Sequence, residues 1–252
     1  MAFLSCDFFS DALQVGTSMT VLLPQRTEVQ IGVEGTAPEG PPPVLYLLHG
    51  LSDDHTAWHR FTSIGRYADA AGLAVVMPAA GRSFYSDEAH GHHYWEFVSE
   101  ELPEIVGSFF QVSQQPEETY VAGLSMGGYG AVRLALAHPD RYAAAASMSG
   151  ALDLARAMAD PGRAELSRRI FDDHVSEDED LFTLLDRATV VPPLHLSCGT
   201  EDALLDHTTG FADAALAAGH PVTLDLRPGG HDWALWDALI EEVIAWLPVA
   251  RG

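Results

Sequence analysis

Short apolar runs alternate with segments of helical periodicity along most of this chain. Extended segments are predicted where apolar or small residues are continuous, as in strands that a sheet buries on both faces: 18–33 (one or two strands interrupted at Pro24), 44–50, 73–78, 118–123, 142–150, 193–199 and 221–229. Apolar residues recur at helical spacing between them, in 64–72, 93–110, 128–138, 210–219 and 232–247. This alternation predicts an α/β fold with a mostly parallel central sheet and helices on both faces.

Two segments depart from the alternation. Residues 34–43, EGTAPEGPPP, are a predicted surface loop, because proline and glycine do not continue a strand ladder. Residues 151–190 are rich in arginine and then in acid, as in DDHVSEDED, and carry no strand signal. We interpret them as a short lid-like insertion packed over one edge of the sheet. Because no linker or repeat divides the remainder, residues 1–252 are expected to form a single domain.

The composition restricts the partners of the chain. Of 252 residues, 47% are hydrophobic, which is enough for a sizeable core. The 13 basic residues are all arginine, and 36 acidic residues give a formal net charge of −23. Such a surface repels nucleic acid phosphates and anionic lipid, so neither nucleic acid nor a membrane is an expected partner. A small-molecule substrate is the expected partner instead.

The two cysteines and the N-terminal residues indicate the cellular compartment in which the protein is expected. Cys6 and Cys198 lie too far apart in sequence to indicate a disulfide framework or a zinc site, which fits a reducing compartment. The first residues, MAFLSCDFFSDALQ, lack the basic start of a signal peptide. No run approaches the roughly 18 apolar residues of a membrane span. A cytoplasmic location is therefore expected.

The segment GLSMG places Ser125 between a predicted strand and a predicted helix. This context gives the G-x-S-x-G pattern meaning, since Gly123 and Gly127 allow the two backbones to approach while the hydroxyl projects above the sheet. The helix that follows directs backbone N–H groups toward the same place. Ser125 is therefore the candidate nucleophile.

A serine nucleophile needs a histidine base, which a carboxylate orients. His231, in PGGHDWALW, follows the strand 221–229 and opens the last helix, so it lies where site loops gather at the carboxyl ends of strands. His138, at a helix end, and His195, within a strand, fit structural roles better, and His220 precedes a strand and so lies on the wrong edge of the sheet. His231 is therefore the candidate base.

The acid has one leading candidate and two alternatives. Asp202 follows the strand 193–199, and the chain order serine, acid, histidine fits this position. A helix N-cap would also explain an aspartate there. Asp153 follows an earlier strand, at a position that some proteins of this fold use, and Glu201 adjoins Asp202 but should point away from the site.

An oxyanion formed at Ser125 needs two backbone donors. The expected donors are the N–H of Met126, after the nucleophile, and the N–H of Leu51, in the loop HGLSDDHTAW after an early strand. Three aromatic residues near the predicted site, Tyr94, Trp95 and Trp233, are candidate substrate-binding residues, with Tyr85 and Trp236 as further aromatic neighbours.

Two groups of histidines could suggest a metal, namely His55 with His59 and the run His90, His92 and His93. Neither fits a known metal-binding spacing such as H-E-x-x-H. With a complete serine constellation available, no catalytic metal and no cofactor are expected.

Several segments together resemble the esterase D family of α/β-hydrolases: LYLLHGLSDDHTAW, EELPEIV, VAGLSMGGYGAVRLAL, HPDRYAAAASMSG, CGTEDALL and GGHDWALW. The family includes S-formylglutathione hydrolases, bacterial acetyl and tributyrin esterases, and mycolyltransferases. The resemblance spans about Phe3 to Leu247 and is greatest to the small acetyl and tributyrin esterases, which begin directly with a strand. It implies the α/β-hydrolase fold, the triad Ser125, Asp202 and His231, and oxyanion donors at Leu51 and Met126.

The resemblance implies a serine carboxylesterase acting on short-chain acyl esters through an acyl-enzyme. It leaves two alternatives: hydrolysis of S-formylglutathione or a related thioester, and acyl transfer to an alcohol. The loop HGLSDDHTAW departs from the form typical of S-formylglutathione hydrolases, and no export signal like that of mycolyltransferases is visible. A binding protein on an inactive hydrolase scaffold is a fourth reading, which an intact triad disfavours. The assembly stays open between a monomer and a homodimer, since relatives often pair.

Overall fold

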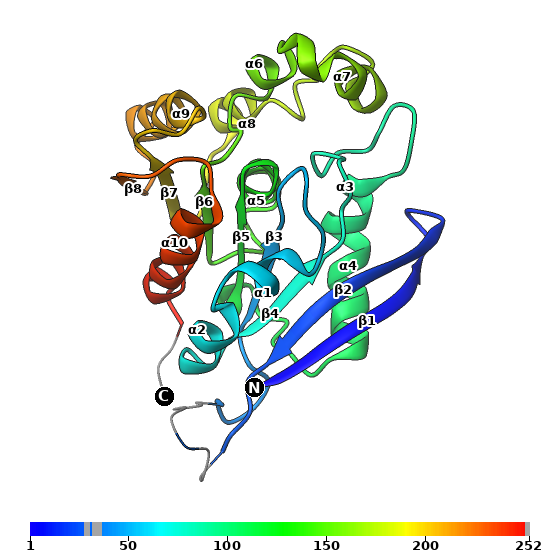
Figure 1. The fold of residues 1–252 in the computed structure, drawn as a ribbon, viewed down its shortest axis with the longest axis vertical. Helices are drawn as coiled ribbons and strands as arrows, with labels where there is room; N and C mark the ends of the chain where they lie inside the picture. The colour runs from blue at the N-terminus through cyan, green and yellow to red at the C-terminus, as the bar shows by residue number, and fades with distance from the viewer. Residues whose placement is uncertain (28–30, 32–36, 250–252) are drawn as a thin grey trace.

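A computed structural model describes residues 1–27, 31 and 37–249. Eight strands form one sheet in the order β1-β2-β4-β3-β5-β6-β7-β8 (Figure 1). Their bounds are β1 Ala2–Ser10, β2 Val15–Leu23, β3 Val44–Leu48, β4 Ala74–Pro78, β5 Thr119–Leu124, β6 Ala144–Met148, β7 Leu194–Gly199 and β8 Val222–Arg227. Strand β2 is antiparallel to both β1 and β4, whereas the six strands from β4 to β8 run parallel.

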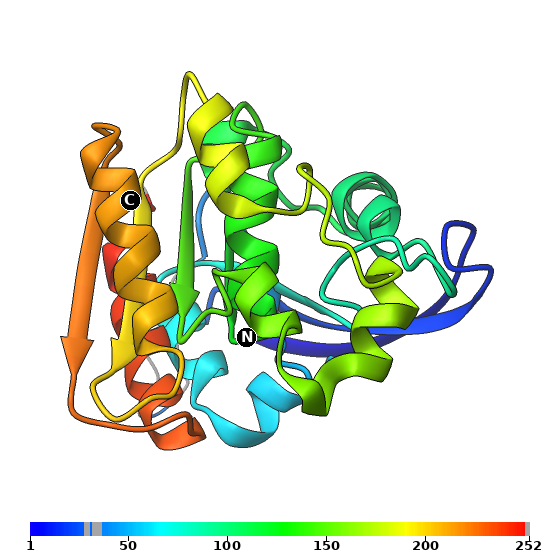
Figure 2. The ribbon, with the colours of Figure 1, turned by 90° about the horizontal axis from the view of Figure 1, so that it is seen from above.

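Helices cover both faces of the sheet (Figure 2). One apolar core lies under α4 (Leu102–Phe109), α5 (Met126–Ala137) and α9 (Leu205–Ala217). The other lies under α1 (Ala57–Phe61), α2 (Ile64–Ala70) and α10 (Trp233–Trp246). Side chains alternate between the two cores along β5, with Val121 in the first and Tyr120 and Ala122 in the second, as expected for a strand buried on both faces. This architecture confirms the predicted α/β-hydrolase fold.

The connection from β6 to β7 holds the helices α6 (Leu154–Met158), α7 (Ala164–Phe171) and α8 (Leu181–Arg187), with the 3₁₀ turn η3 (Pro161–Arg163). These helices lie at the top of Figure 1, far from the two chain termini. Helix α8 packs against α5 and α9. Residues 151–190 thus hold helices and no strand, in keeping with their lack of a strand signal.

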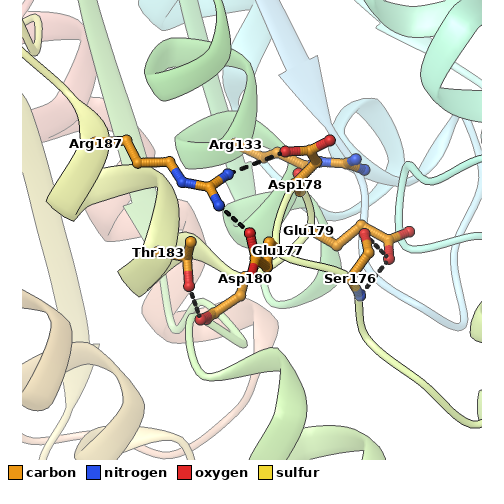
Figure 3. Close-up of polar contacts among 8 residues, drawn as sticks. All are labelled: Arg133, Ser176, Glu177, Asp178, Glu179, Asp180, Thr183 and Arg187. Atoms are coloured by element: carbon orange, nitrogen blue, oxygen red, sulfur yellow. Dashed lines mark hydrogen bonds and ion pairs between the residues drawn. The ribbon is translucent and has the colours of Figure 1, made fainter.

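The acidic part of this connection is attached to α5 through its backbone, and its side chains bond within the segment and to Arg187 (Figure 3). The hydroxyl of Tyr129 donates to the carbonyl of Glu179 at 2.7 Å, and Nε of Arg133 donates to the carbonyl of Asp178 at 3.1 Å. Arg187 forms ion pairs with Glu177 and Asp178. Backbone carbonyls and arginines therefore fix a segment whose charge alone would favour a solvated loop.

Other element boundaries differ modestly from the predictions. The helix predicted over 93–110 is interrupted: α3 (Tyr94–Glu96) leads through a π-helical turn η1 (Phe97–Glu101) into α4, which carries proline near its start. Helix α9 begins at Leu205, five residues earlier than predicted. Its first turns bury the polar residues His207 and Thr208, so the spacing of apolar residues did not indicate them. A short 3₁₀ turn η2 (Pro116–Glu118) precedes β5. Part of the strand predicted over 18–33 lies outside the described residues.

Candidate active site

Ser125 lies in a strained turn between β5 and α5. Its φ of 52° and ψ of −114° are rare for a residue other than glycine. A Cβ at Gly123 would lie 2.3 Å from the carbonyl oxygen of Gly127, and one at Gly127 would lie 2.4 Å from that of Leu48. Only glycine fits where backbone meets backbone at such distances, which explains the spacing of the two glycines around the serine.

Three side chains predicted from distant parts of the sequence meet at this turn. Nε2 of His231 lies 3.0 Å from Oγ of Ser125, and Nδ1 of His231 lies 2.9 Å from Oδ2 of Asp202. Each follows a parallel strand, since Ser125 comes after β5, Asp202 after β7 and His231 after β8. With the proton on Nδ1, directed at the carboxylate, Nε2 is free to accept the serine proton.

The Asp202 carboxylate is held ionised. Its side chain has no exposed area, and burial alone would raise its pKa. Hydrogen bonds from His231, from the N–H of Leu204 at 2.8 Å and from the hydroxyl of Ser149 outweigh burial, and the pKa of Asp202 is lowered. The carboxylate can therefore stabilise an imidazolium at His231.

The two alternative acids lie elsewhere. Asp153 caps α6 by accepting the N–H of Arg156 at 2.9 Å, and its own N–H bonds to His207 at 3.2 Å. The carboxylate of Glu201 accepts the N–H of Gly229 at 2.5 Å, away from the histidine ring. Neither carboxylate has a hydrogen bond to His231 among the described residues, whereas Asp202 has two.

The two expected oxyanion donors belong to segments that adjoin Ser125. Met126 begins α5, so its N–H has no partner one turn earlier in the helix. Leu51 follows Gly50, and a Cβ at Gly50 would lie only 3.8 Å from the Cβ of Ser125. The loop after β3 thus passes beside Ser125, and backbone N–H groups in this region are the type of donor that stabilises developing negative charge.

His49, the first residue of the segment HGLSDDHTAW, fastens that loop. Its Nε2 accepts the N–H of Ala80 at 3.0 Å, and its Nδ1 lies 2.7 Å from the carbonyl of Gly50. Both bonds are satisfied by a neutral ring that donates from Nδ1. Burial lowers the pKa of His49 to about 4, although the bond to Gly50 partly opposes this shift.

A lowered histidine pKa predicts a loss of stability in mild acid. The unfolded chain binds the proton with the ordinary pKa of 6.5, so between pH 6.5 and about 4 the unfolded state holds more protons. The contribution of His49 is complete above pH 6.5 and is lost as pH falls. We expect it to lower the free energy of unfolding by about 2 kcal/mol between pH 7 and 5.

The measurement is urea unfolding at both pH values for wild type and His49→Gln, whose amide cannot titrate. Because other histidines titrate in both proteins, the difference between the two pH dependences isolates His49. An equal loss of stability in the variant would contradict a neutral, buried His49.

Two of the candidate substrate-binding residues lie on or next to α3. The ring of Trp95 stacks on His138 with 5.7 Å between centroids, and the guanidinium of Arg133 lies over the same ring, 4.0 Å from its centroid. Both partners belong to the second half of α5 and its end, far from Ser125. The hydroxyl of Tyr94 lies beside Gly81, in the loop after β4. These contacts account for Trp95 as a packing residue, and a role in substrate binding stays a prediction for both.

Trp233 belongs to an aromatic cluster beside the base. Its ring lies edge-on to Trp58 at 5.3 Å and to Trp236 at 5.2 Å, and it contacts the half-exposed Phe61 at 5.0 Å. Trp236 in turn meets the ring of His231 edge-on at 4.8 Å. The cluster provides apolar surface next to the reacting histidine, so Trp233 is the best placed of the three candidates.

Two of the other histidines pack against tryptophan rings. His195 is buried in β7 against Trp246, and His138 packs on Trp95.

Within residues 1–27, 31 and 37–249, no group of three or more histidine, cysteine or carboxylate side chains could hold a metal ion. Over the same residues, no helix is long and apolar enough to cross a membrane.

Comparisons with known proteins find esterases that match almost the whole chain. A family model described as putative esterase matches residues 10–247. The acetyl esterase of Caldicellulosiruptor saccharolyticus is 27% identical over 267 residues, which cover 98% of each chain. Both matches span β2 to β8, the turn at Ser125 and the loops that carry Asp202 and His231.

Solved structures give the same result. FphF, a fluorophosphonate-binding serine hydrolase of Staphylococcus aureus, superposes with a TM-score of 0.88 at 32% identity, covering 98% of both chains. The S-formylglutathione hydrolase FrmB of the same organism superposes with a TM-score of 0.84, also at 32% identity and with 98% of both chains covered. These likenesses extend over almost the whole chain rather than over the nucleophile segment alone.

Proposed function

We propose that this chain, which belongs to the family described as putative esterase, hydrolyses short-chain acyl esters with Ser125 as nucleophile. The chain is a serine hydrolase that acts as an esterase, as its family and its likeness to serine hydrolases show. The observation that carries the proposal is the continuous hydrogen-bonded chain from Ser125 through His231 to Asp202.

In the proposed acylation step, Oγ of Ser125 attacks the ester carbonyl while Nε2 of His231 takes the hydroxyl proton. The carbonyl π electrons move to oxygen, and the N–H groups of Leu51 and Met126 stabilise the oxyanion. Collapse of the intermediate expels the alkoxide, which receives the proton from His231. The products are the free alcohol and an acyl-enzyme ester at Ser125.

Deacylation repeats the sequence with water as the nucleophile. His231 removes one proton from water, the hydroxide adds to the acyl carbonyl, and Ser125 leaves with that proton. Throughout, Asp202 stays ionised and stabilises the imidazolium of His231. No cofactor takes part in either step.

The preference for short acyl groups is supported by the acetyl esterase that resembles the whole chain. We also propose that residues 151–190 act as a lid-like insertion of a single domain, since their helices lie at one end of the molecule and pack on α5 and α9. Tyr94, Trp95 and Trp233 stay candidate substrate-binding residues, with Trp233 supported by its closeness to His231 through Trp236.

The test is a series of p-nitrophenyl esters from acetate to decanoate. We expect kcat/KM to be highest for acetate to butyrate and to fall for longer acyl chains. Reaction with a fluorophosphonate probe should occur at Ser125 in the same preparation. A preference for decanoate would contradict the short-chain assignment, and failure of the probe to react would favour a binding protein on an inactive scaffold.

A thioesterase activity is a second candidate, favoured by the likeness to FrmB. Comparing kcat/KM for S-formylglutathione with that for p-nitrophenyl acetate distinguishes the two, and we expect the oxygen ester to be preferred. Acyl transfer would appear as an ester product when an alcohol is added during turnover.

The proposed partner is the small-molecule ester itself, since the net charge of −23 disfavours nucleic acid. A cytoplasmic location is supported by the two unpaired cysteines, Cys6 and Cys198. A homodimer stays a prediction, which light scattering of the purified protein would test.

A further inference from the structure

Tyr85 is a fully buried tyrosine in the loop after β4, and its backbone conformation is rare outside glycine. Its φ is 52°, and the φ of Phe84 just before it is 53°. Left-handed backbone at a bulky residue is strained, and it persists only where the surrounding contacts over-determine it. The contacts that maintain Tyr85 therefore indicate what this loop holds in place.

The hydroxyl of Tyr85 reaches the loop of the first expected oxyanion donor. It donates to the carbonyl of His49 at 3.0 Å. The next carbonyl along the chain, that of Gly50, lies 2.7 Å from Nδ1 of His49 and accepts the N–H of Asp53 at 3.1 Å. Because the peptide that joins Gly50 to Leu51 is planar and trans, fixing the Gly50 carbonyl fixes the direction of the Leu51 N–H. Tyr85 thus anchors the first of two successive peptide units that lead to this donor.

The same part of the loop is fastened to α5. A Cβ at Gly130 would lie 2.7 Å from the ring of Tyr85, so the ring packs directly on the backbone of this helix. Nη1 of Arg133 donates to the carbonyl of Tyr85 at 3.2 Å. The N–H of Phe84 donates to Sδ of Met126 at 3.3 Å. These contacts hold the loop against the helix whose first N–H is the second expected oxyanion donor.

One tyrosine therefore joins the two segments that carry the expected donors. Resting on the proposed function, we propose that Tyr85 is a positioning residue that sets the separation and direction of the N–H groups of Leu51 and Met126. These donors act on the negative charge that develops on the substrate carbonyl oxygen. The contribution of Tyr85 should accordingly appear in the transition state and not in the binding of the substrate.

The first test is Tyr85→Phe, which removes the hydroxyl and keeps the ring that packs on α5. We expect kcat for p-nitrophenyl acetate to fall about tenfold with KM unchanged, less than the roughly 10²-fold effect of losing a donor outright. Wild-type kcat in Tyr85→Phe, or a raised KM with unchanged kcat, would overturn the proposal.

The matched control is Tyr120→Phe. Tyr120 is also buried, and its hydroxyl lies within hydrogen-bonding distance of the carbonyls of Glu117, at 3.3 Å, and Pro248, at 3.2 Å. It lies near the start of β5, at the opposite end of that strand from Ser125. Both variants should lower the midpoint of urea unfolding, because each loses a hydrogen bond from a buried side chain, but Tyr120→Phe should keep wild-type kcat. An equal loss of kcat in the two variants would mean that Tyr85 is merely structural.

Inhibition by trifluoroacetone reports directly on the oxyanion donors. Oγ of Ser125 bonds to the ketone carbon, the carbonyl π electrons move to oxygen, and the serine proton passes to His231, so the adduct resembles the transition state. We expect its Ki to rise about tenfold in Tyr85→Phe, in step with the fall in kcat/KM, and to stay unchanged in Tyr120→Phe. An unchanged Ki beside a lowered kcat would show that the hydroxyl does not act on the donors, and the proposal would fail.

Rates of fluorophosphonate labelling at Ser125 separate this proposal from the substrate assignment. If no ester is turned over but labelling falls about tenfold in Tyr85→Phe and not in Tyr120→Phe, the proposed substrate fails while the positioning role stands. If ester hydrolysis depends on Ser125 but Tyr85→Phe behaves as wild type in both assays, the positioning role fails while the proposed function stands.

Discussion

Replacing Ser125 by alanine is expected to reduce the kcat for p-nitrophenyl acetate by about 10⁶-fold. Oγ of Ser125 is the protein atom that bonds to the acyl carbon in the proposed mechanism, and it lies 3.0 Å from Nε2 of His231. The residual rate should be that of attack by water, assisted only by the donors of Leu51 and Met126. Steady-state assays with enzyme purified free of the host's own esterases measure this ratio.

The control for this variant is Ser52→Ala. Ser52 is an exposed serine in the same loop as the donor Leu51, and its loss should leave kcat within twofold of wild type. Mass spectrometry of the wild-type enzyme after fluorophosphonate treatment should place the adduct on the peptide that holds Ser125. Hydrolysis that survives in Ser125→Ala, with the adduct elsewhere, would refute the nucleophile.

The geometry around Ser125 could be predicted because each contributing signal is local. A glycine two residues on each side of a serine, an apolar strand before it and a helix after it are all visible within one segment. Asp202 and His231 follow from the rule that site loops lie at the carboxyl ends of parallel strands, which needs only the order of strands. The structure brings exactly these side chains within hydrogen-bonding distance.

The features that the sequence did not reveal depend on contacts between distant segments. His49 fastens its loop through Ala80, which lies 31 residues away, and the indole of Trp236 donates a hydrogen bond to Ser149, which lies 87 residues away. Trp95 shows a second limitation. The sequence places it near the predicted site, but it does not show that its ring packs on His138 and Arg133.

Replacing Gly127 by alanine is expected to destabilise the fold by about 3 kcal/mol. In most helices this change is favourable, because alanine loses less backbone entropy than glycine on folding. Here the new Cβ would lie 2.4 Å from the carbonyl oxygen of Leu48 and 2.7 Å from that of His49. Both contacts are with backbone, which cannot rotate away as a side chain can, so α5 must separate from β3.

Gly210→Ala is the matched control for that change. Gly210 also lies inside a helix, α9, but a Cβ there meets nothing within 4 Å. The control should gain about 0.5–1 kcal/mol, so urea unfolding should place the two variants on opposite sides of wild type. Strand β3, which must shift, leads through His49 into the loop that holds Leu51. Gly127→Ala should therefore also lower kcat under conditions in which the variant is still folded. A variant with wild-type stability would mean that β3 and α5 are not in backbone contact at the nucleophile, and the strained turn would lose its physical cause.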